Sequence, residues 1–82
     1  MKARAGVHVE WVDQEAVILD PTTERLHYLN QTAALLFGLI EEFGFDDAVT
    51  KMRERFGSED GFEEQLEAVI EQMLEEGLLE RD

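Results

Sequence analysis

The sequence predicts a small α+β domain, because strand patterns come first and helical patterns follow. Three segments before residue 30 alternate apolar and polar residues or are rich in β-branched ones, as short strands are. Three later segments repeat apolar residues at helical spacing. With 82 residues there is room for one core, so we expect a single domain over residues 1–82. Its three-stranded antiparallel sheet should lie against one side of a helical layer.

The strands are expected at residues 7–12, 16–19 and 25–29, after a loose end at residues 1–6. A polar break at residues 13–15 is short enough to join the first two strands as an antiparallel hairpin. Asp20 and Pro21 provide the turn before the third strand, since Pro fixes φ and Asp can bond its own downstream backbone. The three strands should therefore form a meander.

The first two helices are expected at residues 31–42 and 45–56. Asn30 is a good N-cap, and apolar side chains cover more than half of the first helix, which makes it the central helix of the core. Gly44 should close it, because glycine readily adopts positive φ. The second helix has apolar residues at helical spacing and ends at Gly57.

The third helix should begin with a capping box formed by Asp60 and Glu63, and end at Gly77. Its apolar arc spans roughly 140° by the helical step of about 100° per residue. This arc consists of Phe62, Leu66, Val69, Ile70, Met73 and Leu74. After the helix, Leu78 and Leu79 should fold back onto the core.

Charge and composition exclude several classes of protein. Twenty acidic and seven basic residues give a formal net charge of -13, which repels nucleic acid and anionic lipid and favours cationic partners. There is no cysteine, so a disulfide framework or a thiolate site is excluded and a reducing compartment is the default. No apolar run is long enough for a signal peptide or a membrane span. We therefore expect a soluble, cytoplasmic protein.

Catalytic chemistry is not visible in the sequence. It has no glycine-rich phosphate loop and no pattern joining a nucleophile to a base. His8 and His27 lie on expected strands without metal-ligand spacing, so we interpret them as polar or structural. Glu63, Glu67 and Glu71 are spaced to hold a divalent cation weakly, although a solvated helix face is the simpler explanation. We expect no enzyme, metal site or cofactor.

A binding surface remains, and the third strand is its first candidate. As the last strand of a meander it should lie at a sheet edge, where unpaired N–H and C=O groups can bind another chain. Its residues include neither proline nor lysine, and they are Arg25, Leu26, His27, Tyr28 and Leu29. Alternatively, a helix or residues 78–81 cover this edge. One border of the third helix could likewise wall a groove beside the strand, or its whole arc could be core.

Residues 28–37 resemble the signature of PqqD-like proteins, the peptide-recognition domains of ribosomal peptide natural-product pathways. The signature is aromatic-x-Leu-Asn-x-Thr-Ala-Ala-hydrophobic, and the matching residues are Tyr28, Leu29, Asn30, Thr32, Ala33, Ala34, Leu35, Leu36 and Phe37. The resemblance extends over nearly the whole chain. There are two mild departures, because Gln31 stands where the family often has proline and Phe37 where it often has tryptophan.

The resemblance implies a winged helix-turn-helix-like fold and a non-catalytic role. Such domains bind the leader of a precursor peptide as an added strand on the third strand, and hand it to a radical-SAM maturase, a cyclase or a leader peptidase. The product can be a quinone cofactor, a lasso peptide or another compound. The acidic charge favours a leader with basic and apolar residues. The implied peptide-binding residues are Arg25, Leu26, His27, Tyr28, Leu29, Leu66, Val69, Ile70 and Met73.

Two other functions fit the same elements. A winged-helix DNA-binding protein would use the third helix for recognition, but the carboxylates of that helix would face phosphates at a heavy electrostatic cost. A structural dimer would pair edge to edge through the third strand. The sequence therefore leaves open whether the domain is a monomer or a homodimer.

Overall fold

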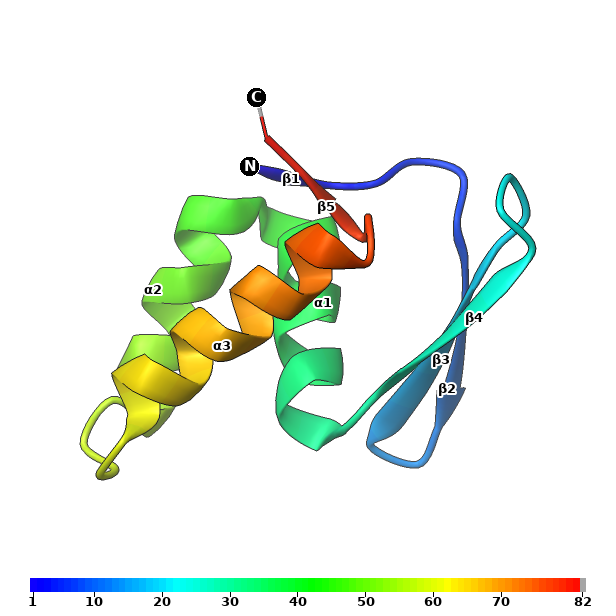
Figure 1. Ribbon diagram of the computed structural model, residues 1–82. Coiled ribbons are helices and arrows are strands. Elements are labelled where there is room, and N and C mark those ends of the chain that lie inside the picture. Colours follow the sequence, from blue (N-terminus) through cyan, green and yellow to red (C-terminus); the bar gives the residue numbers. More distant parts are fainter. Residues whose placement is uncertain (82) are drawn as a thin grey trace.

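The computed structural model describes residues 1–81 and confirms the α+β class, with strands first and helices after (Figure 1). Strands β2 (His8–Val12), β3 (Glu15–Asp20) and β4 (Arg25–Leu29) form an antiparallel sheet in the order β2-β3-β4. Helices α1 (Gln31–Phe43), α2 (Phe45–Phe56) and α3 (Phe62–Glu75) follow. Figure 1 shows the three helices grouped on one side of this sheet. The predicted meander and hairpin are thus confirmed.

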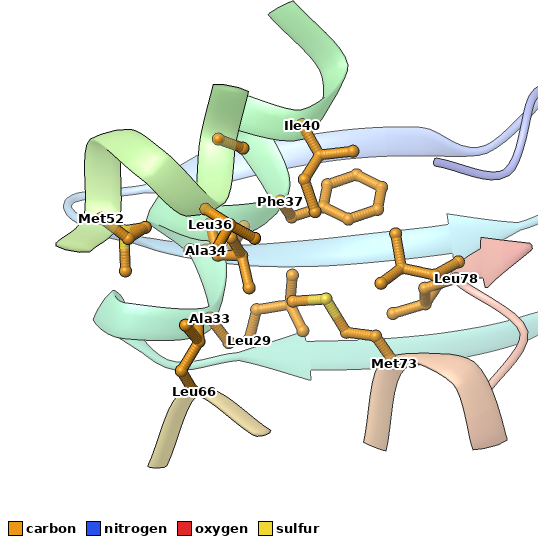
Figure 2. Packing of buried hydrophobic residues seen from close by; sticks show 14 of the residues in the cluster. Leu29, Ala33, Ala34, Leu36, Phe37, Ile40, Met52, Leu66, Met73 and Leu78 are labelled. Carbon is orange, nitrogen blue, oxygen red and sulfur yellow. The ribbon is translucent and has the colours of Figure 1, made fainter. Parts of the chain in front are cut away.

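Helix α1 is the centre of the fold, as its apolar circumference predicts. The side-chain oxygen of Asn30 accepts a hydrogen bond from the backbone N–H of Ala33 at 3.0 Å, which fixes the first turn. The α1 backbone lies close to β3 and β4 on one side and to α2 on another. Figure 2 shows its buried side chains, with Met73 and Leu78 entering the core from the end of α3. The buried residues of α1 are Ala33, Ala34, Leu36, Phe37 and Ile40.

The start of α3 differs from the prediction. Gly61, with φ 76°, occupies the N-cap position, and no side chain caps the helix there. The predicted capping box of Asp60 and Glu63 is therefore wrong. The positive φ of Gly61 turns the chain one residue later than Asp60, and the Glu63 carboxylate instead accepts hydrogen bonds from Arg53 of α2.

The end of α3 is closed as predicted, by Gly77 at φ 77°. The Gly77 N–H donates to the carbonyl of Leu74 at 3.1 Å, and the Leu78 N–H donates to that of Met73 at 2.8 Å. This pair of bonds is the Schellman motif, which lets the chain reverse direction. Leu78 and Leu79 consequently fold back and are buried in the core.

A short second sheet joins the two ends of the described chain, where the sequence predicts a loose N-terminus. Strand β1 (Lys2–Ala3) pairs antiparallel with β5 (Leu79–Glu80). Leu79 of β5 is buried, and the Arg4 N–H extends the contact by donating to the Leu78 carbonyl at 2.9 Å. Strands of two residues have no periodicity that a sequence pattern could reveal.

The helices of residues 1–81 have at most 14 residues, and none of them combines the length and the apolar character needed to cross a bilayer.

Candidate functional site

The free edge of β4 is the first part of the candidate site. Within residues 1–81, β4 pairs with β3 on one side and with no strand on the other, and β5 pairs with β1 instead. The prediction that this strand lies at a sheet edge is therefore confirmed. In an antiparallel strand the backbone groups alternate between the two sides, so part of the N–H and C=O groups of β4 point away from β3. These groups can bind a further strand.

The side chains of β4 divide between the two faces of the sheet. His27 and Leu29 are buried toward the helices, whereas Leu26 and Tyr28 are 64% and 78% exposed on the opposite face. Arg25 is also exposed and lies opposite Asp20 of β3. The backbone edge is consequently flanked by core side chains on one face and by exposed apolar side chains on the other.

The second part of the site is a hollow of about 280 Å³ that β4 and α3 share. Four of the residues predicted to bind a peptide line it, namely Tyr28, Leu29, Val69 and Met73. Its other lining residues are Glu15, Asn30, Ala33, Gln72 and Glu76. We call it the β4–α3 hollow. Gln72 and Glu76 were not among the predicted residues, although the helical spacing that puts Val69 and Met73 on this side also puts these two there.

Leu66 and Ile70 are not brought to the β4–α3 hollow. Both line a different hollow, between α2 and α3, together with Phe45 and Val49. Leu66 is also only 3% exposed. The apolar arc of α3 is thus divided, with one border toward α2 and the other toward β4.

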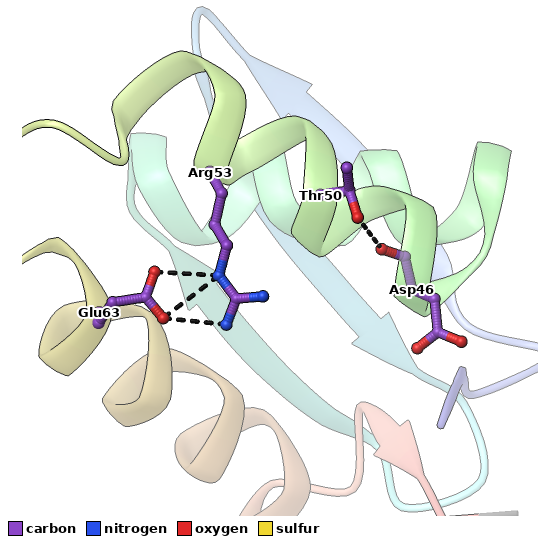
Figure 3. A network of polar contacts seen from close by, with 4 residues as sticks. All are labelled: Asp46, Thr50, Arg53 and Glu63. Carbon is purple, nitrogen blue, oxygen red and sulfur yellow. Dashed lines mark hydrogen bonds and ion pairs between the residues drawn. The ribbon is translucent and has the colours of Figure 1, made fainter.

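The N-terminal turn of α3 is joined to α2 by an ion pair. Arg53 donates to both carboxylate oxygens of Glu63, over 2.9 to 3.2 Å (Figure 3). These hydrogen bonds lower the pKa of Glu63 below its ordinary value and raise the pKa of Arg53. The rings of Phe56 and Phe62 also stack there, with centroids 6.4 Å apart. The start of α3 therefore contacts α2, while its C-terminal half borders the hollow.

Acidic groups surround this C-terminal half. The Glu76 carboxylate lines the hollow and lies 3.4 Å from Nδ1 of His27, whose side chain is 7% exposed. His27 Nε2 is buried and has no hydrogen-bond partner in the described part of the chain. Glu15 adds a second carboxylate to the lining. The lining of the hollow thus combines apolar side chains with two carboxylates.

Neither histidine belongs to a metal site in the part of the chain that the structure describes. His8 is exposed and lies 3.1 Å from Glu10, whereas His27 is buried beside Glu76. Over residues 1–81, no group of three or more His, Asp or Glu side chains is gathered closely enough to hold a metal ion. Of the three glutamates whose spacing could suit a divalent cation, Glu63 is paired with Arg53.

The family model described as "Coenzyme PQQ synthesis protein D (PqqD)" matches residues 15–79, well over half of the chain. The chain belongs to the PqqD family. The resemblance seen in residues 28–37 is thereby confirmed, and PqqD membership implies a role in the biosynthesis of PQQ or of another ribosomally made peptide product. No curated protein and no solved structure was found to match.

PqqD proteins are non-catalytic accessory proteins that bind a peptide substrate and a partner enzyme. The match begins at Glu15, the first residue of β3, and ends at Leu79, within β5. It includes the free edge of β4 and all of α3, and therefore both parts of the candidate site. Strand β2, with Trp11, lies outside the matched residues.

Proposed function

We propose that this domain binds the leader segment of a ribosomally synthesised precursor peptide as an added strand along β4, and presents it to a modifying enzyme or a leader peptidase. The observation that carries the proposal is the free backbone edge of β4 beside the β4–α3 hollow. Such an edge gives a peptide main-chain hydrogen bonds, and an adjoining hollow selects its side chains.

The chemistry of the hollow supports a leader that carries both apolar and basic residues. Leu29, Val69 and Met73 offer apolar surface, and an extended peptide points every second side chain to the same face. Glu15 and Glu76 add two carboxylates to the lining. In a molecule of net charge -13, that arrangement favours Lys or Arg next to an apolar anchor.

Presentation to an enzyme follows from a site of this kind. Strand addition holds a leader by its backbone and leaves the segment after it free to enter an active site. The catalytic partner we propose is a radical-SAM maturase, a cyclase or a leader peptidase. The domain contributes binding and positioning, which raise the effective concentration of the peptide near the enzyme.

The proposal is tested with two lysine substitutions on α3, Val69→Lys and Ala68→Lys. Val69 lines the hollow, whereas its neighbour Ala68 is exposed and does not. Both variants add the same charge, so only the position differs. For a synthetic leader encoded beside this gene, Val69→Lys should weaken binding by about tenfold or more, since the ammonium group would replace an apolar contact. Ala68→Lys should stay within about twofold of the original affinity.

Calorimetric titration measures the affinities, and circular dichroism with thermal unfolding checks that both variants are folded. Equal affinity of the two folded variants would place the leader elsewhere on the molecule. The absence of binding to any leader encoded nearby would contradict the proposed function itself.

A further inference from the structure

A second and larger hollow lies at the opposite edge of the sheet, beside β2. It measures about 650 Å³, and Trp11 of β2 and the α1 residues Leu35, Gly38 and Leu39 form its apolar part. Trp11 is 51% exposed. A Cβ atom at Gly38 would meet the Trp11 ring at 3.2 Å, so the absence of a side chain there lets the indole lie against the helix. We call this the Trp11 hollow.

Three carboxylates line the same hollow as the indole, and none of them has a cationic partner among residues 1–81. They belong to Asp13, Glu41 and Glu42. Partial burial raises the pKa of Glu41 above its ordinary value. Arg55 also lines the hollow, but its guanidinium group lies over the ring of Phe56, with its carbon 5.3 Å from the ring centroid. Negative groups therefore outnumber positive ones in the lining of the Trp11 hollow.

We propose that the Trp11 hollow binds an arginine side chain of a partner protein. A guanidinium group is planar, so it can stack on an indole while its fixed fork of N–H groups donates to carboxylates in the same plane. The ammonium group of lysine also donates to carboxylates, but it has no planar face that stacks on the ring. A second copy of this chain is a poor occupant, because two molecules of charge -13 repel one another. The hollow is separate from the leader site, which lies at the β4 edge, and Trp11 and Asp13 lie outside the family match.

Trp11 provides a direct reporter, since it is the only tryptophan in the sequence. We would follow its indole N–H by NMR while adding the tripeptide Ac-Gly-Arg-Gly-NH2 at low salt. Two matched probes replace arginine by lysine or by citrulline, which has nearly the same shape as arginine but no charge. The arginine probe should shift the indole resonance and bind about two- to fivefold more tightly than the citrulline probe. The lysine probe should bind with intermediate affinity.

Charge variants separate a local site from the general acidity of the protein. The double variant Glu41→Gln/Glu42→Gln should weaken arginine binding by about fivefold. Its control is Glu67→Gln/Glu71→Gln on α3, which removes the same charge from exposed positions outside the hollow and should change the affinity by less than about twofold. Arg55→Gln should strengthen binding, because it removes a competing cation from the lining of the hollow.

Three results would overturn the proposal. An indole resonance that does not move at saturating probe would exclude Trp11 from any site. Equal affinity for the arginine and citrulline probes would exclude recognition of charge. Equal loss in the two double variants would attribute binding to net charge alone. Because these readouts use tripeptides and no leader, they are independent of the β4 site.

Discussion

Asp20 shows how a single turn residue can connect distant parts of the chain. Its carboxylate accepts a hydrogen bond from the Thr22 N–H at 3.0 Å, the turn role that the sequence predicts. The same carboxylate is buried and lies 3.1 Å from the guanidinium of Arg4, which directly follows strand β1. Asp20 therefore joins the small terminal sheet to the β3–β4 hairpin.

Replacing Asp20 by Asn should destabilise the fold by about 1–3 kcal/mol, because the charge partner of a partly buried guanidinium is lost. The amide oxygen can still accept from Thr22, so the loss would come mainly from the ion pair. Urea unfolding measures the free-energy change. Asp60→Asn is the matched control at an exposed position, where a change below about 0.5 kcal/mol is expected. Similar losses in both variants would show that the ion pair adds nothing.

Two polar residues at expected helix starts show how far capping can be predicted from sequence. Asn30 has an extended backbone and caps α1, because no adjacent glycine moves the N-cap of this helix to another residue. Asp60 precedes Gly61, whose positive φ moves the N-cap by one residue. Asp is a common N-cap residue in proteins, but at this position the neighbouring glycine determines where the helix begins.

Helix α3 is the element on which the proposed leader site depends, and its two ends are held differently. Arg53 and the stacked pair of Phe56 and Phe62 join its start to α2. The Schellman motif at Gly77 joins its end to the core through Leu78. The half between these anchors carries Val69 and Met73 beside β4.

The ion pair between Arg53 and Glu63 makes the stability of the fold depend on pH. Since its pKa is lowered in the folded protein, Glu63 stabilises the fold above its unfolded pKa, and this contribution is lost as the pH falls through the folded pKa. Urea unfolding should therefore show Glu63→Gln less stable than the original protein at neutral pH, with a difference that shrinks to zero in strong acid. The effect should be small because both groups are exposed. A difference independent of pH would contradict this assignment.

The sequence predicts best those helices and strands that are long and that have turn residues or glycines at both ends. The sequence predicts β4 and α2 with their observed bounds, because turn residues, glycines and a strong periodicity mark both ends. Strands β1 and β5 were not predicted, since two residues carry no pattern. The α3 arc is apolar as predicted, but periodicity alone does not tell that Leu66 faces α2 while Val69 faces β4.

For the molecule as a whole, charge limits the partners more strongly than shape does. Helix α3 carries five glutamates and no basic residue, and the net charge is -13. This negative charge would repel a phosphate backbone that approaches α3, whereas it would attract a basic peptide. Acidity of this kind favours peptide recognition over DNA recognition.

The charge predicts that the protein will not be retained on double-stranded DNA even in about 10 mM salt, where electrostatic forces extend to about 30 Å. Chromatography on immobilised DNA measures this, with a basic DNA-binding domain as the positive control. Retention that is released by salt would contradict the assignment and would favour the winged-helix DNA-binding alternative.

The proposed leader site is easier to recognise in the sequence than the Trp11 hollow, for a physical reason. The β4 edge is contained in five consecutive residues, and the signature of residues 28–37 leads directly from it into α1. The Trp11 hollow combines β2, the turn after it and one face of α1, which are brought together only by folding. His27 and Glu76 likewise meet from distant parts of the sequence, and neither carries a pattern that predicts the contact.

The central claim is that a leader peptide adds as a strand to β4, and NMR of the labelled domain bound to an unlabelled leader tests it most directly. We expect strand-type NOEs between the leader backbone and alternate residues of 25–29, new protection of the outward-facing amides there, and side-chain NOEs to Val69. A leader that binds with NOEs only to the helices, to the exposed side chain of Leu26, or to the Trp11 hollow would contradict the claim.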